Sequence, residues 1–196
     1  THAMATLPAL RHLPNAITLA RAVAIPVIAL ALLRHDYDTA LLLFVLCALG
    51  DFVDGWLARR FDVRTRFGAV ADPLADKLTM LTVTVLLAWQ GALPWWFALL
   101  VVTRDVVIVS GALAYHFHVG HVTMAPTRLS KLNTALEFAF LTGVLAVAAG
   151  VLDDGAALRV LMWTCSVTIV ASGTQYVLLW SRKAADERRG VRVGAS

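Results

Sequence analysis

Residues 39–60 read TALLLFVLCALGDFVDGWLARR, an apolar run that continues into a segment with two carboxylates and ends at two arginines. The run shows no alternation of apolar and polar residues, so it predicts a helix rather than a half-buried strand. About 20 mostly apolar residues are enough for a helix to cross the hydrocarbon core of a bilayer. This stretch therefore predicts a membrane-spanning helix that carries acidic groups near one end.

Five further stretches have a similar length and composition. With residues 39–58 as one span, the others are expected at residues 16–33, 74–90, 95–115, 132–151 and 158–181. The chain has 196 residues, of which 59% are hydrophobic and 15% charged, whereas a soluble domain has about 25% charged residues. The same numbers exclude a disordered chain, which lacks apolar material. We therefore expect an all-α integral membrane protein, a bundle of six transmembrane helices.

Basic residues are distributed unequally between the two sides of such a bundle. Two lie on one side, Arg34 and Arg159. Twelve lie on the side that would hold both termini: Arg11, Arg59, Arg60, Arg64, Arg66, Arg128, Lys131, Arg182, Lys183, Arg188, Arg189 and Arg192. The positive-inside rule then predicts that both termini are cytoplasmic. The net charge of +4 is explained by topology and by attraction to anionic lipids, so we expect no nucleic-acid partner.

The residues before the first span support two interpretations. Residues 7–18 mix apolar residues with Arg11 and His12, which is typical of a short amphipathic helix on the membrane interface or of an ordered tail. The opening residues Thr1, His2 and Ala3 resemble the remnant of an expression tag. We place the protein in a bacterial inner membrane as a multi-pass protein with its active site facing the cytoplasm.

Several ionisable residues fall within or at the ends of the expected spans. Each costs about 2.5–3.5 kcal/mol near the centre of a bilayer, so such residues face the protein interior and mark function. They are Arg21, Lys77, Arg104, Asp51, Asp54, Asp72, Asp76, Asp105 and Glu137.

Four of the carboxylates form two pairs on consecutive helices. Asp51 and Asp54 are three residues apart, and Asp72 and Asp76 are four apart, so each pair shares one helix face. A short cytoplasmic loop joins the helices, so the four groups are expected to converge. Hard oxygen ligands favour Mg²⁺, Ca²⁺ or Mn²⁺, and four carboxylates suffice for two ions about 3.5–4 Å apart. A cation-coupled membrane transporter is the alternative use of such carboxylates.

The pattern Asp51-x2-Asp54-Gly55-x2-Ala58-Arg59-x8-Gly68-x3-Asp72-x3-Asp76 resembles the signature of the CDP-alcohol phosphotransferases. The resemblance implies a single membrane domain over residues 1–196, with six helices and both termini cytoplasmic. It implies transfer of a phosphatidyl group from CDP-diacylglycerol to an alcohol, with release of CMP. It also implies two divalent metal ions, Mg²⁺ or Mn²⁺, and a homodimer, which is common among the relatives.

The resemblance also assigns roles to individual residues. The metal ligands would be Asp51, Asp54, Asp72 and Asp76, and Asp76 would also be the general base that takes the proton of the acceptor hydroxyl. The residues that bind the donor would be Asn15, Gly55, Ala58, Arg59 and Thr65.

The basic residues of other helices offer a site for a phosphate on the acceptor. They are Arg104, Arg128 and Lys131, since guanidinium and ammonium groups suit phosphate. Residues 13–15 and 72–77 resemble both cardiolipin synthases, whose acceptor is phosphatidylglycerol, and phosphatidylglycerophosphate synthases, whose acceptor is glycerol 3-phosphate. Residues 103–106 and 126–134 resemble the cardiolipin type more closely, so phosphatidylglycerol is the expected acceptor and glycerol 3-phosphate the alternative.

Overall fold

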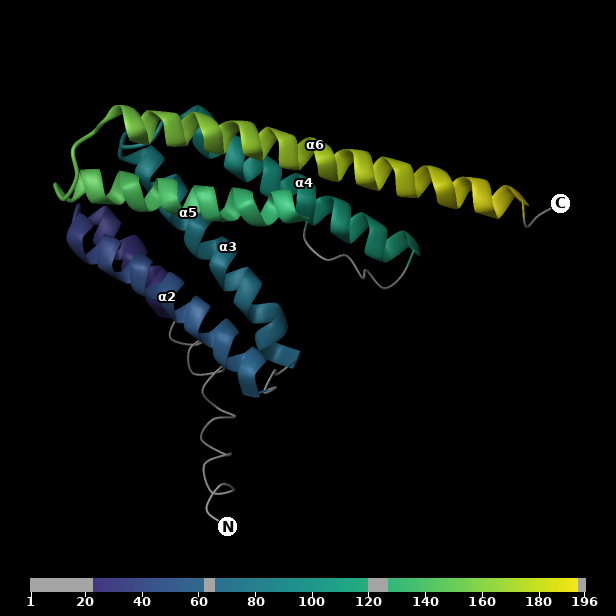
Figure 1. Ribbon diagram of the computed structural model, residues 1–196, viewed down its shortest axis with the longest axis horizontal. Helices are drawn as coiled ribbons and strands as arrows, with labels where there is room; N and C mark the ends of the chain where they lie inside the picture. Colours follow the sequence, from purple (N-terminus) through teal and green to yellow (C-terminus); the bar gives the residue numbers. More distant parts are fainter. Residues whose placement is uncertain (1–22, 62–65, 120–126, 194–196) are drawn as a thin grey trace, which may run out of the picture. The chain divides into compact units, whose positions relative to one another are not determined.

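The computed structural model describes residues 23–61, 66–119 and 127–193, and the side chains of residues 23–50, 75–111 and 127–179. All regular structure in these ranges is helical, which confirms the all-α prediction. The helices are Val23–Leu33, α2 (Tyr37–Phe61), α3 (Arg66–Trp89), α4 (Trp95–Val119), α5 (Arg128–Ala148) and α6 (Ala156–Val193) (Figure 1). The expected amphipathic segment at residues 7–18 lies outside the described residues.

The helices match the six predicted apolar stretches, and two of them extend well beyond the predicted bounds. α3 begins at Arg66 rather than at residue 74, and α6 continues to Val193 rather than to residue 181. A span is predicted from its apolar residues, whereas a helix also continues through charged residues such as Arg, Lys and Glu, which are good helix formers. Helix boundaries therefore extend beyond the apolar segments that located them.

Two of the described helices are long and apolar enough to cross a membrane. They are Arg128–Ala148 and Ala156–Leu179, and two shorter apolar helices cover Val23–Leu33 and Tyr37–Gly50. The apolar part of α2 ends where its acidic residues begin, and α3 contains two aspartates and a lysine. Among the described helices, length and composition thus support two of the six predicted membrane spans.

The chain divides into two compact units. The first comprises the described residues of Thr1–Leu93 and Leu141–Asp154, and the second those of Pro94–Phe140 and Gly155–Ser196. In the first unit, the Gln90 side-chain amide donates a hydrogen bond to the Leu32 carbonyl, which joins the ends of two helices. Fully or nearly fully buried apolar side chains form its core: Ile28, Leu32, Phe44, Val83, Leu87, Leu93, Leu141 and Leu145.

In the second unit, α4 packs against α6. Near the start of both helices, the rings of Trp96 and Trp163 stack with their centroids 5.4 Å apart and an interplanar angle of 24°. Phe97, on α4, contacts Phe140 of α5 with ring centroids 4.9 Å apart. These aromatic contacts fix the three helices of this unit at one end.

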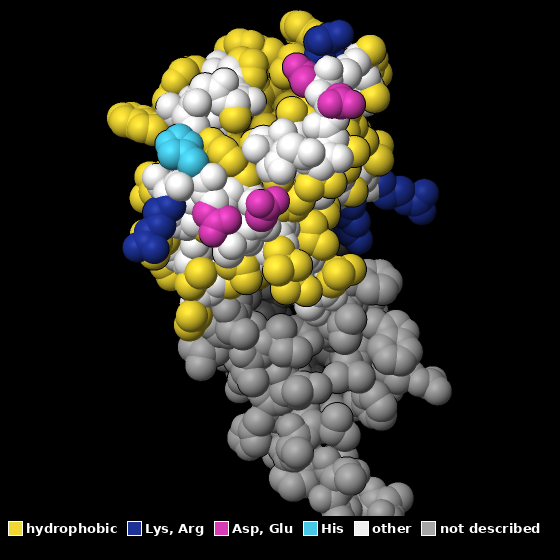
Figure 2. All heavy atoms as spheres, turned by 90° about the vertical axis from the view of Figure 1, so that its left-hand side faces the viewer, with side chains coloured by type: hydrophobic (Ala, Val, Ile, Leu, Met, Phe, Trp, Pro, Cys, Tyr) yellow, Lys and Arg dark blue, Asp and Glu magenta, His cyan; other side chains and the backbone are white. Residues whose placement is uncertain are grey.

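Many large hydrophobic side chains are exposed, and several polar side chains are buried beside the apolar core. Large hydrophobic side chains are exposed along one face of α6, at Val160, Trp163, Val167, Val170 and Val177. On the face shown in Figure 2, yellow hydrophobic side chains are spread widely among white polar and backbone atoms, and the acidic side chains lie in small clusters. Inside are Thr84, Arg104, Ser130, Asn133, Glu137 and Ser172. Such an arrangement is typical of helices that contact lipid outside and one another through polar groups inside.

Candidate functional site

The four aspartates of the predicted metal site lie on consecutive helices of the first unit. Asp51 and Asp54 are on α2, Asp72 and Asp76 are on α3, and residues 62–65 connect the two helices. Figure 1 shows α3 turning back from the end of α2. A connection of four residues keeps the facing helix ends within about 19 Å of each other.

The two pairs lie at matching distances from this connection. At a rise of 1.5 Å per residue, Asp54 is about 10 Å before the end of α2 and Asp72 about 9 Å after the start of α3. Asp51 and Asp76 are each about 15 Å from the respective helix end. Measured from its own helix end, each helix thus carries one aspartate at each of two matching distances, a spacing compatible with the predicted pair of shared metal sites.

Asp76 is the member of this set whose side chain the structure describes. It is half-buried and already engaged with other groups, as is the neighbouring Lys77. One turn further on, the buried Thr79 hydroxyl donates to the Ala75 carbonyl at 2.9 Å. Among the described side chains, no three His, Cys, Asp or Glu residues gather as a metal site, and those of Asp51, Asp54 and Asp72 lie outside them. The metal site itself stays a prediction.

The predicted donor-binding residues are placed in part. Gly55, Ala58 and Arg59 follow Asp54 within α2, so they continue the helix that carries the first pair of aspartates. Their side chains lie outside those that the structure describes, and so do Asn15 and Thr65 as whole residues. The donor site therefore stays a prediction, and α2 is the helix that would carry three of its residues.

Arg104 is a buried cation at the contact between α4 and α5. Its side chain is 6% exposed; Nη1 donates to Asp105 Oδ1 and Nη2 to Ser130 Oγ, both at 2.7 Å. A guanidinium has five N–H donors, and Arg104 Nε is buried without an acceptor among the described residues. The prediction that this residue is buried is confirmed. Its guanidinium group also has N–H donors that neither of these two hydrogen bonds uses.

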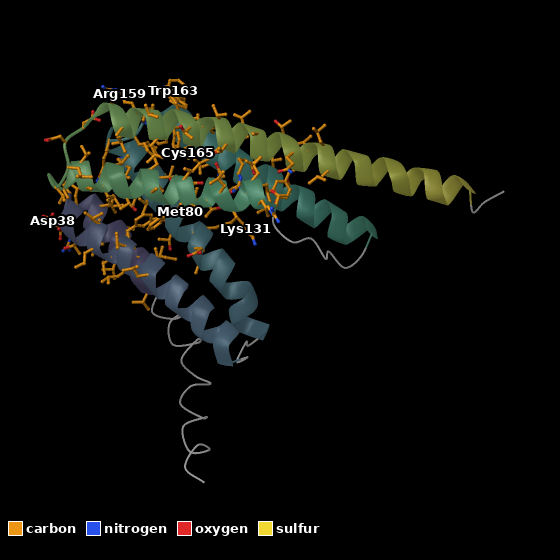
Figure 3. The ribbon with its side chains drawn as sticks, in the orientation of Figure 1. Asp38, Met80, Lys131, Arg159, Trp163 and Cys165 are labelled. Carbon is orange, nitrogen blue, oxygen red and sulfur yellow. The ribbon has the colours of Figure 1, made fainter. Side chains whose placement is uncertain are left out.

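The first turn of α5 is electropositive. Thr127 caps the helix, because its Oγ1 accepts a hydrogen bond from the Ser130 backbone N–H at 3.1 Å. Arg128 and Lys131 are exposed on this turn, and Figure 3 shows Lys131 projecting outward from it. The start of a helix already carries a partial positive charge, so two cations there favour an anion. Arg104 reaches the same turn through Ser130.

Sequence reasoning assigned no role to two polar residues that the structure brings together. Asn133, which is fully buried on α5, accepts through Oδ1 a hydrogen bond from the Thr168 hydroxyl of α6 at 2.8 Å. Ser130, Asn133 and Glu137 are all buried and are spaced three and four residues apart, so they form a stripe on one helix face. Polar residues at intervals of three and four within an apolar stretch were the feature of the sequence that could have indicated this buried polar stripe.

Comparison with known proteins identifies the family. A family model described as CDP-alcohol phosphatidyltransferase matches residues 11–173. The chain belongs to this family. Members of the CDP-alcohol phosphatidyltransferase family use CDP-diacylglycerol and an alcohol acceptor, and they generally depend on divalent metal ions. The matched residues include both aspartate pairs and Arg104. The family model therefore covers residues of both compact units.

Relatives within the family carry two kinds of name. A cardiolipin synthase (CMP-forming) / mitochondrial hydrolase fusion protein of Schizosaccharomyces pombe is 35% identical over 85% of this chain. A probable cardiolipin synthase (CMP-forming) of Drosophila melanogaster is 30% identical over 85% of the chain. A CDP-diacylglycerol–glycerol-3-phosphate 3-phosphatidyltransferase of Rickettsia typhi is 31% identical, again over 85% of the chain.

These relatives differ in how much of their own length is matched. The chain spans 30% of the fission yeast protein, 56% of the fly protein and 96% of the Rickettsia protein. The match to the two synthases is therefore to a part of longer proteins.

Proposed function

We propose that this protein transfers a phosphatidyl group from CDP-diacylglycerol to an alcohol and releases CMP. The observation that carries the proposal is the spacing of the aspartates on α2 and α3, together with membership of the family. Family membership also favours an enzyme over the alternative of a cation-coupled transporter.

In the proposed reaction, the oxygen of the acceptor hydroxyl forms a bond to the phosphorus that carries the diacylglycerol. The bond from this phosphorus to the bridging oxygen of the diphosphate breaks, and CMP leaves with that oxygen. Asp76 takes the hydroxyl proton as the general base. Because charge develops around the transferred phosphorus, the task of the protein is to position the two substrates and to stabilise that charge.

The aspartates suit a pair of hard divalent cations, Mg²⁺ or Mn²⁺. Asp51, Asp54, Asp72 and Asp76 supply only carboxylate oxygens, the ligands that these ions prefer. Bound ions would neutralise the diphosphate and stabilise the leaving group. Gly55, Ala58, Arg59, Asn15 and Thr65 would bind the CDP part of the donor.

We propose that the chain forms one domain of six membrane spans in a bacterial inner membrane, with both termini and the active site cytoplasmic, and that it acts as a homodimer. The two apolar helices and the lipid-facing hydrophobic face of α6 support membrane insertion. The excess of basic residues on one side supports the orientation.

Phosphatidylglycerol is the proposed acceptor, so the enzyme would be of the cardiolipin synthase kind. The names of the yeast and fly relatives support this choice. Glycerol 3-phosphate is the second candidate, favoured by the Rickettsia relative, which the chain matches over nearly its whole length. Either acceptor carries a phosphate for Arg104, Arg128 and Lys131.

The proposal is tested with purified protein, labelled CDP-diacylglycerol and a panel of acceptors that includes phosphatidylglycerol, glycerol 3-phosphate, inositol phosphate and serine. We expect CMP release with phosphatidylglycerol, loss of activity on chelation, and recovery with Mg²⁺ or Mn²⁺. Asp76→Asn should abolish CMP release, whereas Asp38→Asn, an exposed aspartate at the other end of the α2–α3 pair, should not. Full activity of Asp76→Asn would refute the mechanism.

A further inference from the structure

A groove of about 260 Å³ lies in the second unit between α4 and α6. Its walls are mainly apolar, formed by Leu100 and Val107 of α4 and by Ile169, Val170 and Val177 of α6. These residues extend over eight positions of α4 and nine of α6, so the groove is about 10–12 Å long. An elongated apolar groove of this size suits a segment of hydrocarbon chain better than a compact polar headgroup.

Gly173 keeps this groove open. It is half-buried in the groove lining, and a Cβ added there would lie 3.9 Å from Cγ of Arg104, an ordinary van der Waals contact. An alanine therefore fits without displacing any neighbour, whereas the branched side chain of a leucine would project beyond that contact into the groove. The residue type at position 173 thus controls how much of the groove is available.

Arg104 places a cationic side chain in the groove lining. The same guanidinium bonds to Ser130 in the electropositive first turn of α5. A ligand that fits both parts has a hydrocarbon tail and an anionic phosphate next to it, which is the chemistry of a phospholipid. Glycerol 3-phosphate has the phosphate but no chain to fill the groove.

We infer that the groove between α4 and α6 binds an acyl chain of the acceptor, and that the acceptor is therefore a phospholipid with its phosphate at Arg104. The inference rests on the proposed function. The acceptor is favoured over the donor because Arg104, which lines the groove, is one of the residues assigned to the acceptor phosphate, whereas no residue of the groove is among those assigned to the donor.

The first test compares Gly173→Leu with its matched control Gly173→Ala. CMP release is measured with dioleoyl phosphatidylglycerol and with glycerophosphoglycerol, the same headgroup without acyl chains. We expect Gly173→Leu to lower kcat/KM at least tenfold more for the lipid than for the deacylated acceptor, because both acceptors share the phosphate contact with Arg104 and only the lipid has a chain in the groove. Gly173→Ala should change neither value by more than twofold. An equal loss with both acceptors, or no loss with the lipid, would overturn the inference.

A second variant and a second readout make the result independent of one substitution. Val170→Phe narrows the groove from an exposed wall position and should repeat the pattern of Gly173→Leu. Phosphatidylglycerol with a photoreactive acyl chain should cross-link to residues 100–107 or 169–177 in the wild-type protein and not in Gly173→Leu. Competition by phosphatidylcholine equal to that by phosphatidylglycerol would show ordinary lipid contact and overturn the inference.

The two proposals fail in different ways. If no acceptor supports CMP release by the wild-type protein, the proposed function is wrong, and cross-linking still decides whether the groove binds phosphatidylglycerol. If CMP is released but neither groove variant changes the preference between acylated and deacylated acceptors, the proposed function stands and the groove inference is wrong.

Discussion

Arg104→Gln replaces a buried guanidinium by a neutral amide at the contact between α4 and α5. The change removes the ion pair with Asp105 and the hydrogen bond to Ser130, both 2.7 Å long. It also removes the charge that we assign to the acceptor phosphate. Two effects are therefore expected, one on the stability of the second unit and one on the use of the acceptor.

Hydrogen bonds to charged groups contribute about 1.5–3 kcal/mol each. Loss of one such bond to the acceptor phosphate corresponds to roughly a 10- to 150-fold lower kcat/KM. The bond to Ser130 is of the same kind and should contribute a similar free energy of unfolding. Since the donor does not contact Arg104 in the proposed arrangement, the KM for CDP-diacylglycerol should stay unchanged.

The assay measures CMP release at varied acceptor and fixed donor, alongside the thermal unfolding of each variant. Ser130→Ala is the matched control, because it removes the contact between α4 and α5 but keeps the guanidinium. We expect both variants to be destabilised and Arg104→Gln alone to lose most of its kcat/KM for the acceptor. If Ser130→Ala loses as much activity as Arg104→Gln, the role of the arginine is structural and the reasoning is wrong.

Three further outcomes concern stability. A double-mutant cycle of Asn133→Ala and Thr168→Val should give a coupling free energy of about 0.6 kcal/mol, the average for such bonds in membranes, and no coupling would contradict the contact. Thr127→Ala should lower the free energy of unfolding by about 1 kcal/mol, and Thr127→Ser should restore it. The side-chain and backbone hydrogen bonds of Thr39 lower the pKa of Asp36 from 3.8. The folded state is therefore stabilised at pH values above 3.8, where the Asp36 carboxylate is ionised. This stabilisation is lost as the pH falls through the lowered pKa that Asp36 has in the folded state. In a pH titration of unfolding, Asp36→Asn should lack this loss.

The helices could be predicted from the sequence because each contains an apolar run with no competing pattern. The beginning of α3 could not, because Asp72 and Pro73 suggest an end to an apolar span. A proline within a membrane helix is tolerated where neighbouring groups satisfy the freed carbonyl, so the helix runs through it from Arg66. Local composition located the helix, and backbone hydrogen bonding determined its length.

In the candidate site, too, local sequence predicted some features, and others depend on how the helices pack. The spacing of the aspartates predicted their positions on α2 and α3, because a helix converts intervals of three and four residues into one face. The bond between Arg104 and Ser130 joins residues 26 positions apart. It depends on how α4 and α5 pack, which no local pattern contains. The groove at Gly173 could not be predicted from the sequence either, because it arises where a residue without a side chain lies between two packed helices.

The length of α6 has a practical consequence for measuring how deeply this protein is inserted. Its 38 residues extend about 57 Å, nearly twice the roughly 30 Å thickness of a hydrocarbon core. Single spin labels placed along its outer face would report oxygen and nickel-chelate accessibility at successive depths. The residue at which the accessibility reverses marks the water boundary. One straight helix therefore lets electron paramagnetic resonance measure depth and tilt without reference to any other part of the chain.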